Sequence, residues 1–128
     1  MTKWLSTEWF DQTRAMAADQ PERPGLSARI QYEIAGGPDG DVSYFWILED
    51  GRLRSSAPGT IDGPDVTLTM PWNEAVAMHK GELDPNVAFM RGTMKVAGSM
   101  GVMMALLPVT NTPDYLDLRR RIAEITEF

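Results

Sequence analysis

The chain contains no cysteine and only one histidine among its 128 residues. Without cysteine there are no disulfides, thiolate metal sites, iron–sulfur clusters or cysteine nucleophiles, and the fold does not depend on an oxidising compartment. A single histidine cannot form a histidine-based metal site, and the carboxylates show no cluster with metal-ligand spacing. The sequence therefore predicts no metal and no cofactor, and we expect a cytoplasmic location.

No apolar stretch is long enough to cross a membrane. The longest runs from Met100 to Val109, about half the length of a spanning helix. The first residues become charged before an apolar run of signal-peptide length develops, and the last two, Glu127 and Phe128, do not end a peroxisomal tripeptide. We therefore expect neither secretion nor stable insertion into a membrane.

Positive charge is also scarce. Twelve lysines and arginines stand against eighteen acidic residues, which gives a net charge of −6. A negative field repels phosphate backbones and anionic headgroups. The chain has neither a Walker loop nor a G-x-G-x-x-G segment between a strand and a helix. These absences exclude a nucleotide site of either type and make nucleic acid an unexpected partner.

The length and the hydrophobic content of 43% are typical of one globular domain with one core. No composition shift or linker divides the chain. We therefore expect a single domain over residues 1–128, with room for one ligand cavity beside the core.

Apolar periodicity predicts five strands and five helices. Alternating residues predict strands over 26–34, 42–48, 52–55, 65–70 and 93–97. Helical spacing and capping residues predict helices over 6–18, 71–80, 85–91, 99–107 and from Pro113 onward. The strand at 42–48 is apolar on both faces, so we expect it at the centre of the sheet. This order of elements predicts an α+β domain with one mixed five-stranded sheet.

The polar residues form no catalytic constellation. His79 lies on the apolar stripe of its helix, where a partly buried histidine bonded to backbone or water is more common than a general base. The acidic residues from Asp39 to Asp65 occupy turn positions, where carboxylates commonly bond the local backbone. We therefore predict no catalytic residue.

Three consecutive arginines, Arg119 to Arg121, lie in the middle of the last predicted helix. They are candidates for binding an acidic headgroup. A solvated helix face paired with Asp117 and Glu124 is the preferred interpretation, because residues three or four apart are neighbours on a helix.

Methionine is the informative feature. Nine are present, and five of them fall within fifteen residues, namely Met90, Met94, Met100, Met103 and Met104. Methionine is flexible and polarizable, and it is common where one apolar surface must fit ligands of different shape. Ordinary core packing is the alternative. Gly92, Gly98 and Gly101 interleave with the methionines and favour a cavity, because glycine leaves space.

The segment from Phe89 to Leu106 resembles the signature F-M-x-G-x-x-K-x-x-G-D-M-G-x-x-x-x-L of the sterol carrier protein type two family. The context is similar, with a strand at 65–70, a helix, and Gly81-Glu82-Leu83-Asp84-Pro85 in place of that family's G-x-L-D-P. The resemblance covers residues 26–107 well. It implies a five-stranded sheet covered by helices, with an apolar tunnel that takes sterols, fatty acids, acyl-CoA or phospholipids.

Two departures from the family pattern are visible. Ser99 stands where aspartate or asparagine is usual, which keeps the capping chemistry. The predicted helix after Pro113 and the missing peroxisomal tripeptide suggest a stand-alone cytoplasmic relative, with the end of the tunnel covered differently.

These observations predict a non-catalytic carrier of a lipid-like apolar molecule. The residues predicted to line its cavity are Trp46, Leu68, Phe89, Met90, Met94, Val96, Met100, Met103, Met104 and Leu107. One alternative is an isomerase or cyclase that uses the same cavity on a polyketide or steroid, with a buried Tyr, Asp or His as proton carrier. A raised carboxylate pKa inside the cavity would favour it. The other is a dimerisation or accessory module, a homodimer included, whose methionine-rich face meets a protein.

Overall fold

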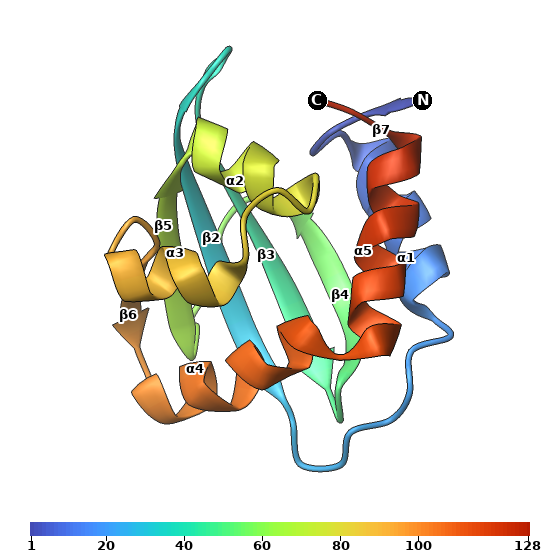
Figure 1. Cartoon of the computed structure of the whole chain (residues 1–128), viewed down its shortest axis with the longest axis vertical. Helices are drawn as coiled ribbons and strands as arrows, with labels where there is room; N and C mark the ends of the chain where they lie inside the picture. The colour runs from blue at the N-terminus through green and yellow to red at the C-terminus, as the bar shows by residue number, and fades with distance from the viewer.

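The computed structural model describes all 128 residues, and Figure 1 shows their arrangement. The strands are β1 (Thr2–Lys3), β2 (Ala28–Gly37), β3 (Gly40–Glu49), β4 (Arg52–Pro58), β5 (Val66–Pro71), β6 (Lys95–Gly98) and β7 (Thr126–Glu127). The helices are α1 (Thr7–Ala17), α2 (Trp72–His79), α3 (Pro85–Arg91), α4 (Met100–Leu106), the 3-10 helix η1 (Leu107–Asn111) and α5 (Pro113–Ile125). The predicted α+β class is confirmed.

The main sheet has five strands in the order β4-β3-β2-β5-β6. The β2–β5 pair is parallel and the other three pairs are antiparallel, so the sheet is mixed as predicted. The middle strand is β2, and the expectation that 42–48 would be central is wrong, although β3 is an interior strand. β2 takes the centre because β5 pairs along its free edge.

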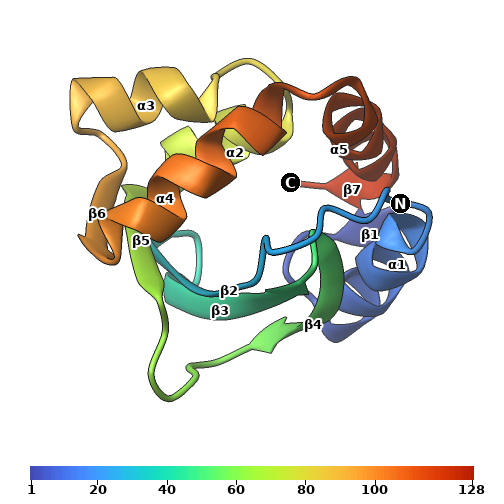
Figure 2. The same cartoon turned by 90° about the horizontal axis from the view of Figure 1, so that it is seen from below.

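A loop covers part of the apolar outer face of β3. The β4–β5 connection lies on the side of the sheet opposite the helices (Figure 2). The buried side chain of Gln31 holds this connection in place through hydrogen bonds. Its amide nitrogen donates to the carbonyls of Tyr44 and Gly59. Its amide oxygen accepts from the Ile61 N–H. A loop therefore partly shields the second face of the sheet.

Helices α2, α3, α4 and α5 all lie on the other face of the sheet, while α1 packs against the β4 edge (Figures 1 and 2). Strand register brings large apolar residues together beneath these helices. Ile30 lies opposite Trp46 and Val66, and Tyr32 lies opposite Tyr44 and Leu68. Because side chains alternate along a strand, these residues share one face. That face is the floor of the interior.

Local capping sets the ends of the helices near the methionine-rich segment. The Ser99 hydroxyl accepts from the Val102 N–H at 3.2 Å, so serine performs the capping expected at this position. Gly92 ends α3 with a φ of 77°, in the left-handed region that glycine adopts most easily. Thr112 caps α5 by accepting from the Tyr115 N–H.

The two ends of the chain meet in a small parallel sheet that the periodicity did not predict. Thr2 pairs with Thr126, and the Trp4 N–H donates to the Glu127 carbonyl at 2.9 Å. The indole N–H of Trp9 donates to the Thr126 hydroxyl at 2.9 Å. Two-residue strands carry no alternation, so only the assembled fold reveals this contact.

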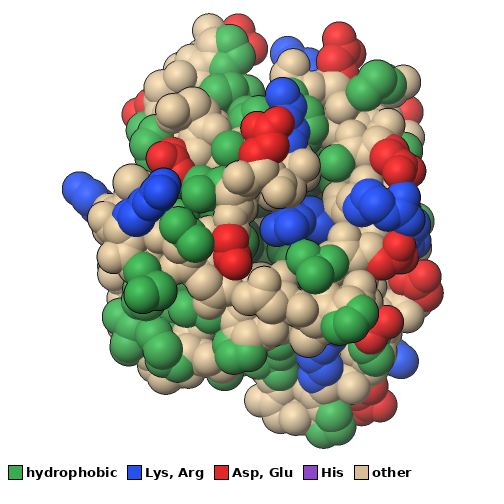
Figure 3. Space-filling model, in the orientation of Figure 1, with side chains coloured by type: hydrophobic (Ala, Val, Ile, Leu, Met, Phe, Trp, Pro, Cys, Tyr) green, Lys and Arg blue, Asp and Glu red, His purple; other side chains and the backbone are tan.

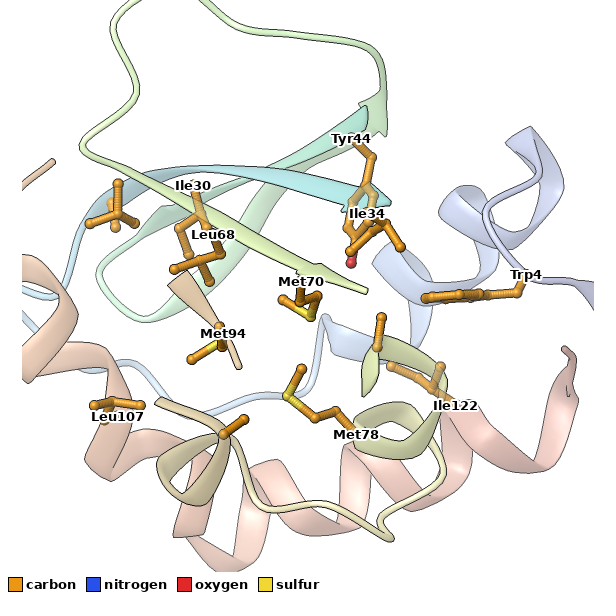
Figure 4. Close-up of a cluster of buried hydrophobic side chains, with 14 of the residues drawn as sticks. Trp4, Ile30, Ile34, Tyr44, Leu68, Met70, Met78, Met94, Leu107 and Ile122 are labelled. Atoms are coloured by element: carbon orange, nitrogen blue, oxygen red, sulfur yellow. The ribbon is translucent and has the colours of Figure 1, made fainter. Parts of the chain in front are cut away.

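The buried hydrophobic residues form one cluster of nineteen, drawn from the sheet, from α1 and from the covering helices (Figure 4). None of the helices combines the length and apolar character needed to cross a bilayer.

Candidate functional site: an apolar cavity under the helices

A cavity of about 160 Å³ lies between the inner face of the sheet and the covering helices. Twenty-seven residues line it, of which twenty are hydrophobic. One water molecule needs about 10–15 Å³ of such space. The cavity is therefore large enough for a portion of an organic ligand, and its lining suits an apolar one.

The floor of the cavity is aromatic. Tyr32 and Tyr44 are cross-strand partners whose rings stack with centroids 4.6 Å apart and an interplanar angle of 5°. Trp46 lies edge-on to Tyr32 at 6.3 Å. Leu68 and Met70 of β5 continue the floor. These rings give the floor a rigid surface, because aromatic side chains have few rotatable bonds.

The opposite wall is more adaptable. Met78 of α2, Met94 just before β6 and Met103 of α4 all line the cavity. Figure 4 shows Met70, Met78 and Met94 converging on the space between sheet and helices. Methionine side chains change shape at low energetic cost, so this wall can adapt to different ligand contours.

The structure divides the ten predicted lining residues into two halves. Those on the cavity are Trp46, Leu68, Met94, Met103 and Leu107. Those not on it are Phe89, Met90, Val96, Met100 and Met104.

The physical reason for this division is helix geometry. Met90 is 84% exposed on α3, while Met100 and Met104 are about half exposed, at 47% and 48%, and share one face of α4 four residues apart. A rotation of about 100° separates Met104 from Met103, so Met104 points away from the sheet when Met103 points toward it. Met100 lies one turn before Met104 on that outer side. Phe89 and Val96 pack against the core outside the cavity.

Periodicity alone did not identify two further parts of the lining. One is the connection after α1, which contributes Gln20, Arg23 and Leu26. The other is α5, which contributes Tyr115, Leu118, Arg119 and Ile122. Arg119 lies four residues after Tyr115 and three before Ile122, on the apolar face of α5. That spacing is the sequence feature from which the inward position of Arg119 could have been predicted.

The prediction that all three arginines lie on a solvated helix face is wrong for Arg119. Arg120 pairs with Asp117 at 2.8 Å and with Glu124 at 2.6 Å, and Arg121 pairs with Asp117 at 3.0 Å, as expected of a solvated face. Arg119 makes no ion pair and lines the cavity. It differs from its neighbours because a rotation of about 100° per residue places it beside Tyr115.

The charge of the lining is positive. No aspartate or glutamate lines the cavity, and Arg23 and Arg119 do. Burial, with a smaller contribution from Arg119, lowers the pKa of His79 to about 4, so its imidazole is neutral at pH 7. The ring of His79 packs against those of Trp4 and Trp9, with ring centroids 5.1 and 5.9 Å apart.

The tyrosines provide neutral hydrogen-bond donors. Burial raises the pKa of Tyr32, Tyr44 and Tyr115, although Arg119 partly offsets the rise for Tyr115. All three phenols therefore keep their protons at neutral pH. A polar group of a ligand entering the cavity would meet hydroxyls and guanidinium groups.

Two polar atoms of the lining residues are buried without a hydrogen-bond partner in the chain. Gln20, only 6% exposed, donates from its amide nitrogen to the Asp114 carbonyl at 3.1 Å, which leaves its amide oxygen unpaired. The indole nitrogen of Trp46 is also unpaired. Buried polar atoms are normally satisfied, so a ligand or water in the cavity would find both an acceptor and a donor here.

The observation that would favour a cyclase or isomerase is a carboxylate with a raised pKa inside the cavity, and no carboxylate lines it. The chain also has no group of three or more histidine or acidic side chains that could hold a metal ion. The arrangement is suited to binding by apolar contact, with polar groups available to orient a ligand.

Known proteins share sequence and fold with this chain. The sequence model of the SCP-2 sterol transfer family matches residues 9–110. Sterol carrier protein 2 of Rattus norvegicus is 30% identical over 84 residues, which cover 65% of this chain and 15% of that protein. Hydroxysteroid dehydrogenase-like protein 2 of Bos taurus is 31% identical over 84 residues, which cover 66% of this chain and 20% of that protein. The match is thus to a small part of each longer protein.

Solved structures share the fold. Palmitated SCP2L2 from Aedes aegypti has a TM-score of 0.63 at 20% identity, over 84% of this chain and 96% of that one. A Thermus thermophilus protein described as possibly a sterol carrier protein has a TM-score of 0.65 at 14% identity, over 95% of this chain and 91% of that one.

Proposed function

Since the chain belongs to the SCP-2 sterol transfer family, we propose that it is a single-domain, non-catalytic carrier that binds a lipid-like amphiphile in the cavity. The observation that carries this proposal is the cavity itself, which has a mostly apolar lining whose only charges are those of Arg23 and Arg119. The apolar body of the ligand lies between the aromatic floor and the methionine wall.

The preferred ligand is a long-chain fatty acid or another single-chain amphiphile with an anionic head. A carboxylate gains charge-assisted hydrogen bonds from a guanidinium group. The lining offers two guanidinium groups and no competing carboxylate. The palmitated state of the Aedes aegypti structure is a further support, because that protein shares the fold.

Stability also favours an occupied cavity. At roughly 24 cal/mol per Å³, a sealed and dry space of about 160 Å³ would cost at most on the order of 4 kcal/mol. The whole stability of a domain is only about 5–15 kcal/mol. The ligand-free protein therefore either contracts around the cavity, which flexible methionines permit, or retains adventitious lipid.

The test is thermal unfolding of delipidated protein with and without palmitate, together with uptake of a fluorescent acyl probe. A ligand at 100 times its dissociation constant adds about 2.7 kcal/mol, which raises the melting temperature by several degrees. Amide exchange in residues 89–107 should slow in parallel. Failure of palmitate, a sterol and the acyl probe to bind at all would overturn the carrier function.

A further inference from the structure

Three exposed methionines of the methionine-rich segment do not line the cavity. Met90 is on α3, and Met100 and Met104 are on α4. The end of α3, β6 and the start of α4 lie at the same edge of the molecule in both views (Figures 1 and 2). Hydrophobic side chains gather at the lower left of the space-filling view, over β6 and α4 (Figure 3). We call the surface made by Met90, Met100 and Met104 the methionine edge.

The charge around the methionine edge differs from that of the rest of the chain. Residues 85–113 contain no aspartate or glutamate, whereas Arg91 and Lys95 give the segment two positive charges. The chain as a whole carries −6. Arg91 and Lys95 are both exposed, and neither forms an ion pair. Exposed apolar side chains are thus accompanied by free positive charge.

The acidic residues that border this segment are engaged with the backbone. Asp84 accepts from the Asn86 N–H at the start of α3, and Asp65, next to Ser99, accepts from the Arg29 N–H. Neither carboxylate pairs with Arg91 or Lys95. The edge therefore presents its cations to whatever approaches it.

From these observations we propose that the methionine edge docks the protein on membrane surfaces that contain anionic phospholipids. The methionines enter the apolar margin of the headgroup region, and Arg91 and Lys95 contact phosphate and carboxylate groups. The negative remainder of the chain is repelled by the same surface, which turns this edge toward it.

A second copy of the chain fits the edge less well. In a two-fold dimer the same patch meets itself, so Arg91 and Lys95 would approach their own copies without any carboxylate from the segment to pair with them. An anionic bilayer provides negative headgroups for Arg91 and Lys95 and an apolar region for the methionine side chains. The inner side of the same segment supplies Met94 and Met103 to the cavity, so docking would bring the ligand site one layer of protein away from the bilayer.

The test is sedimentation with phosphatidylcholine vesicles prepared with and without phosphatidylserine, at low and high salt. Two double variants probe the edge: Met100→Gln with Met104→Gln, and Arg91→Gln with Lys95→Gln. Single-site controls are Leu116→Gln, an exposed apolar residue of α5, and Lys80→Gln, an exposed cation just after α2 that, like Arg91 and Lys95, forms no ion pair. Acyl-probe uptake in solution is measured for each variant, to separate docking from ligand binding.

We expect binding that needs phosphatidylserine and weakens with salt. Each lost cation should lower the partition coefficient about fivefold, and the methionine variant should lower it further than Leu116→Gln does. Probe uptake should stay unchanged. The proposal is overturned if the protein does not sediment with vesicles, if phosphatidylserine makes no difference, or if edge and control variants behave alike. A wild-type dimer that the methionine variant converts to a monomer would also overturn it and assign the edge to self-association.

Discussion

Met103 and Met104 are adjacent in the sequence, and the helical rotation of about 100° between them points one into the cavity and the other toward solvent. Met103 is 3% exposed and lines the cavity, whereas Met104 is 48% exposed and faces outward. The pair therefore offers two sites of equal chemistry, one inside the proposed ligand site and one outside it. Comparable substitutions at the two positions separate cavity effects from general effects of bulk.

Met103→Trp should block ligand uptake, and Met104→Trp should not. The indole at position 103 occupies the space of the ligand, so we expect at least a tenfold weaker affinity for the acyl probe. Because the cavity accommodates the added atoms, unfolding free energy should fall by less than the about 1–3 kcal/mol typical of overpacking a filled core. Probe titration and chemical denaturation measure the two effects. Equal affinities in the two variants would place Met103 outside the ligand site.

Arg119→Gln should reduce the preference for a fatty acid over the corresponding fatty alcohol. A hydrogen bond to a charged group contributes about 1.5 kcal/mol or more, so the ratio of the two affinities should fall roughly tenfold. Arg120→Gln, which changes a solvent-facing residue of the same helix, should leave that ratio unaltered. Competition of acid and alcohol against the acyl probe provides the measurement.

Arg23→Gln completes the test of the anionic head. If the head lies at the end of the cavity near Gln20, this variant changes the acid-to-alcohol ratio in place of Arg119→Gln. A ratio that neither substitution alters would show that the ligand carries no anionic head inside the cavity.

His79 should make the fold less stable in acid. Its pKa is lowered from 6.5 to about 4, so the unfolded chain binds a proton between these values and the folded one resists it. The contribution of His79 to the free energy of unfolding is fully present above pH 6.5 and decreases as the pH falls toward 4. Below that pH the free energy of unfolding is about 3 kcal/mol lower. His79→Phe retains an aromatic ring among Trp4 and Trp9 and removes this dependence. Denaturant unfolding at several pH values should show a flatter profile in the variant, and parallel profiles would remove His79 as the cause.

Local sequence patterns determined the helices and strands. The alternation of β2 and β5, the Ser99 cap and Gly92 each act within a few residues, so their effects could be predicted without the fold. The family signature from Phe89 to Leu106 extended this to the architecture, and the five-stranded mixed sheet under helices is as expected.

Tertiary packing decided which side chains form the site. The spacing of Met100, Met103 and Met104 marks two faces of α4, and only contact with the sheet determines which one turns inward. Arg23 and Gln20 follow α1 in a connection without periodicity, so the chain had to fold before their place on the cavity was visible. Arg119 lines the cavity because α5 packs beside α1 and α2 with Tyr115 and Arg119 on the same inner face. These outcomes depend on contacts between residues far apart in the chain, and sequence patterns record such contacts only weakly because each pattern reports on its own element.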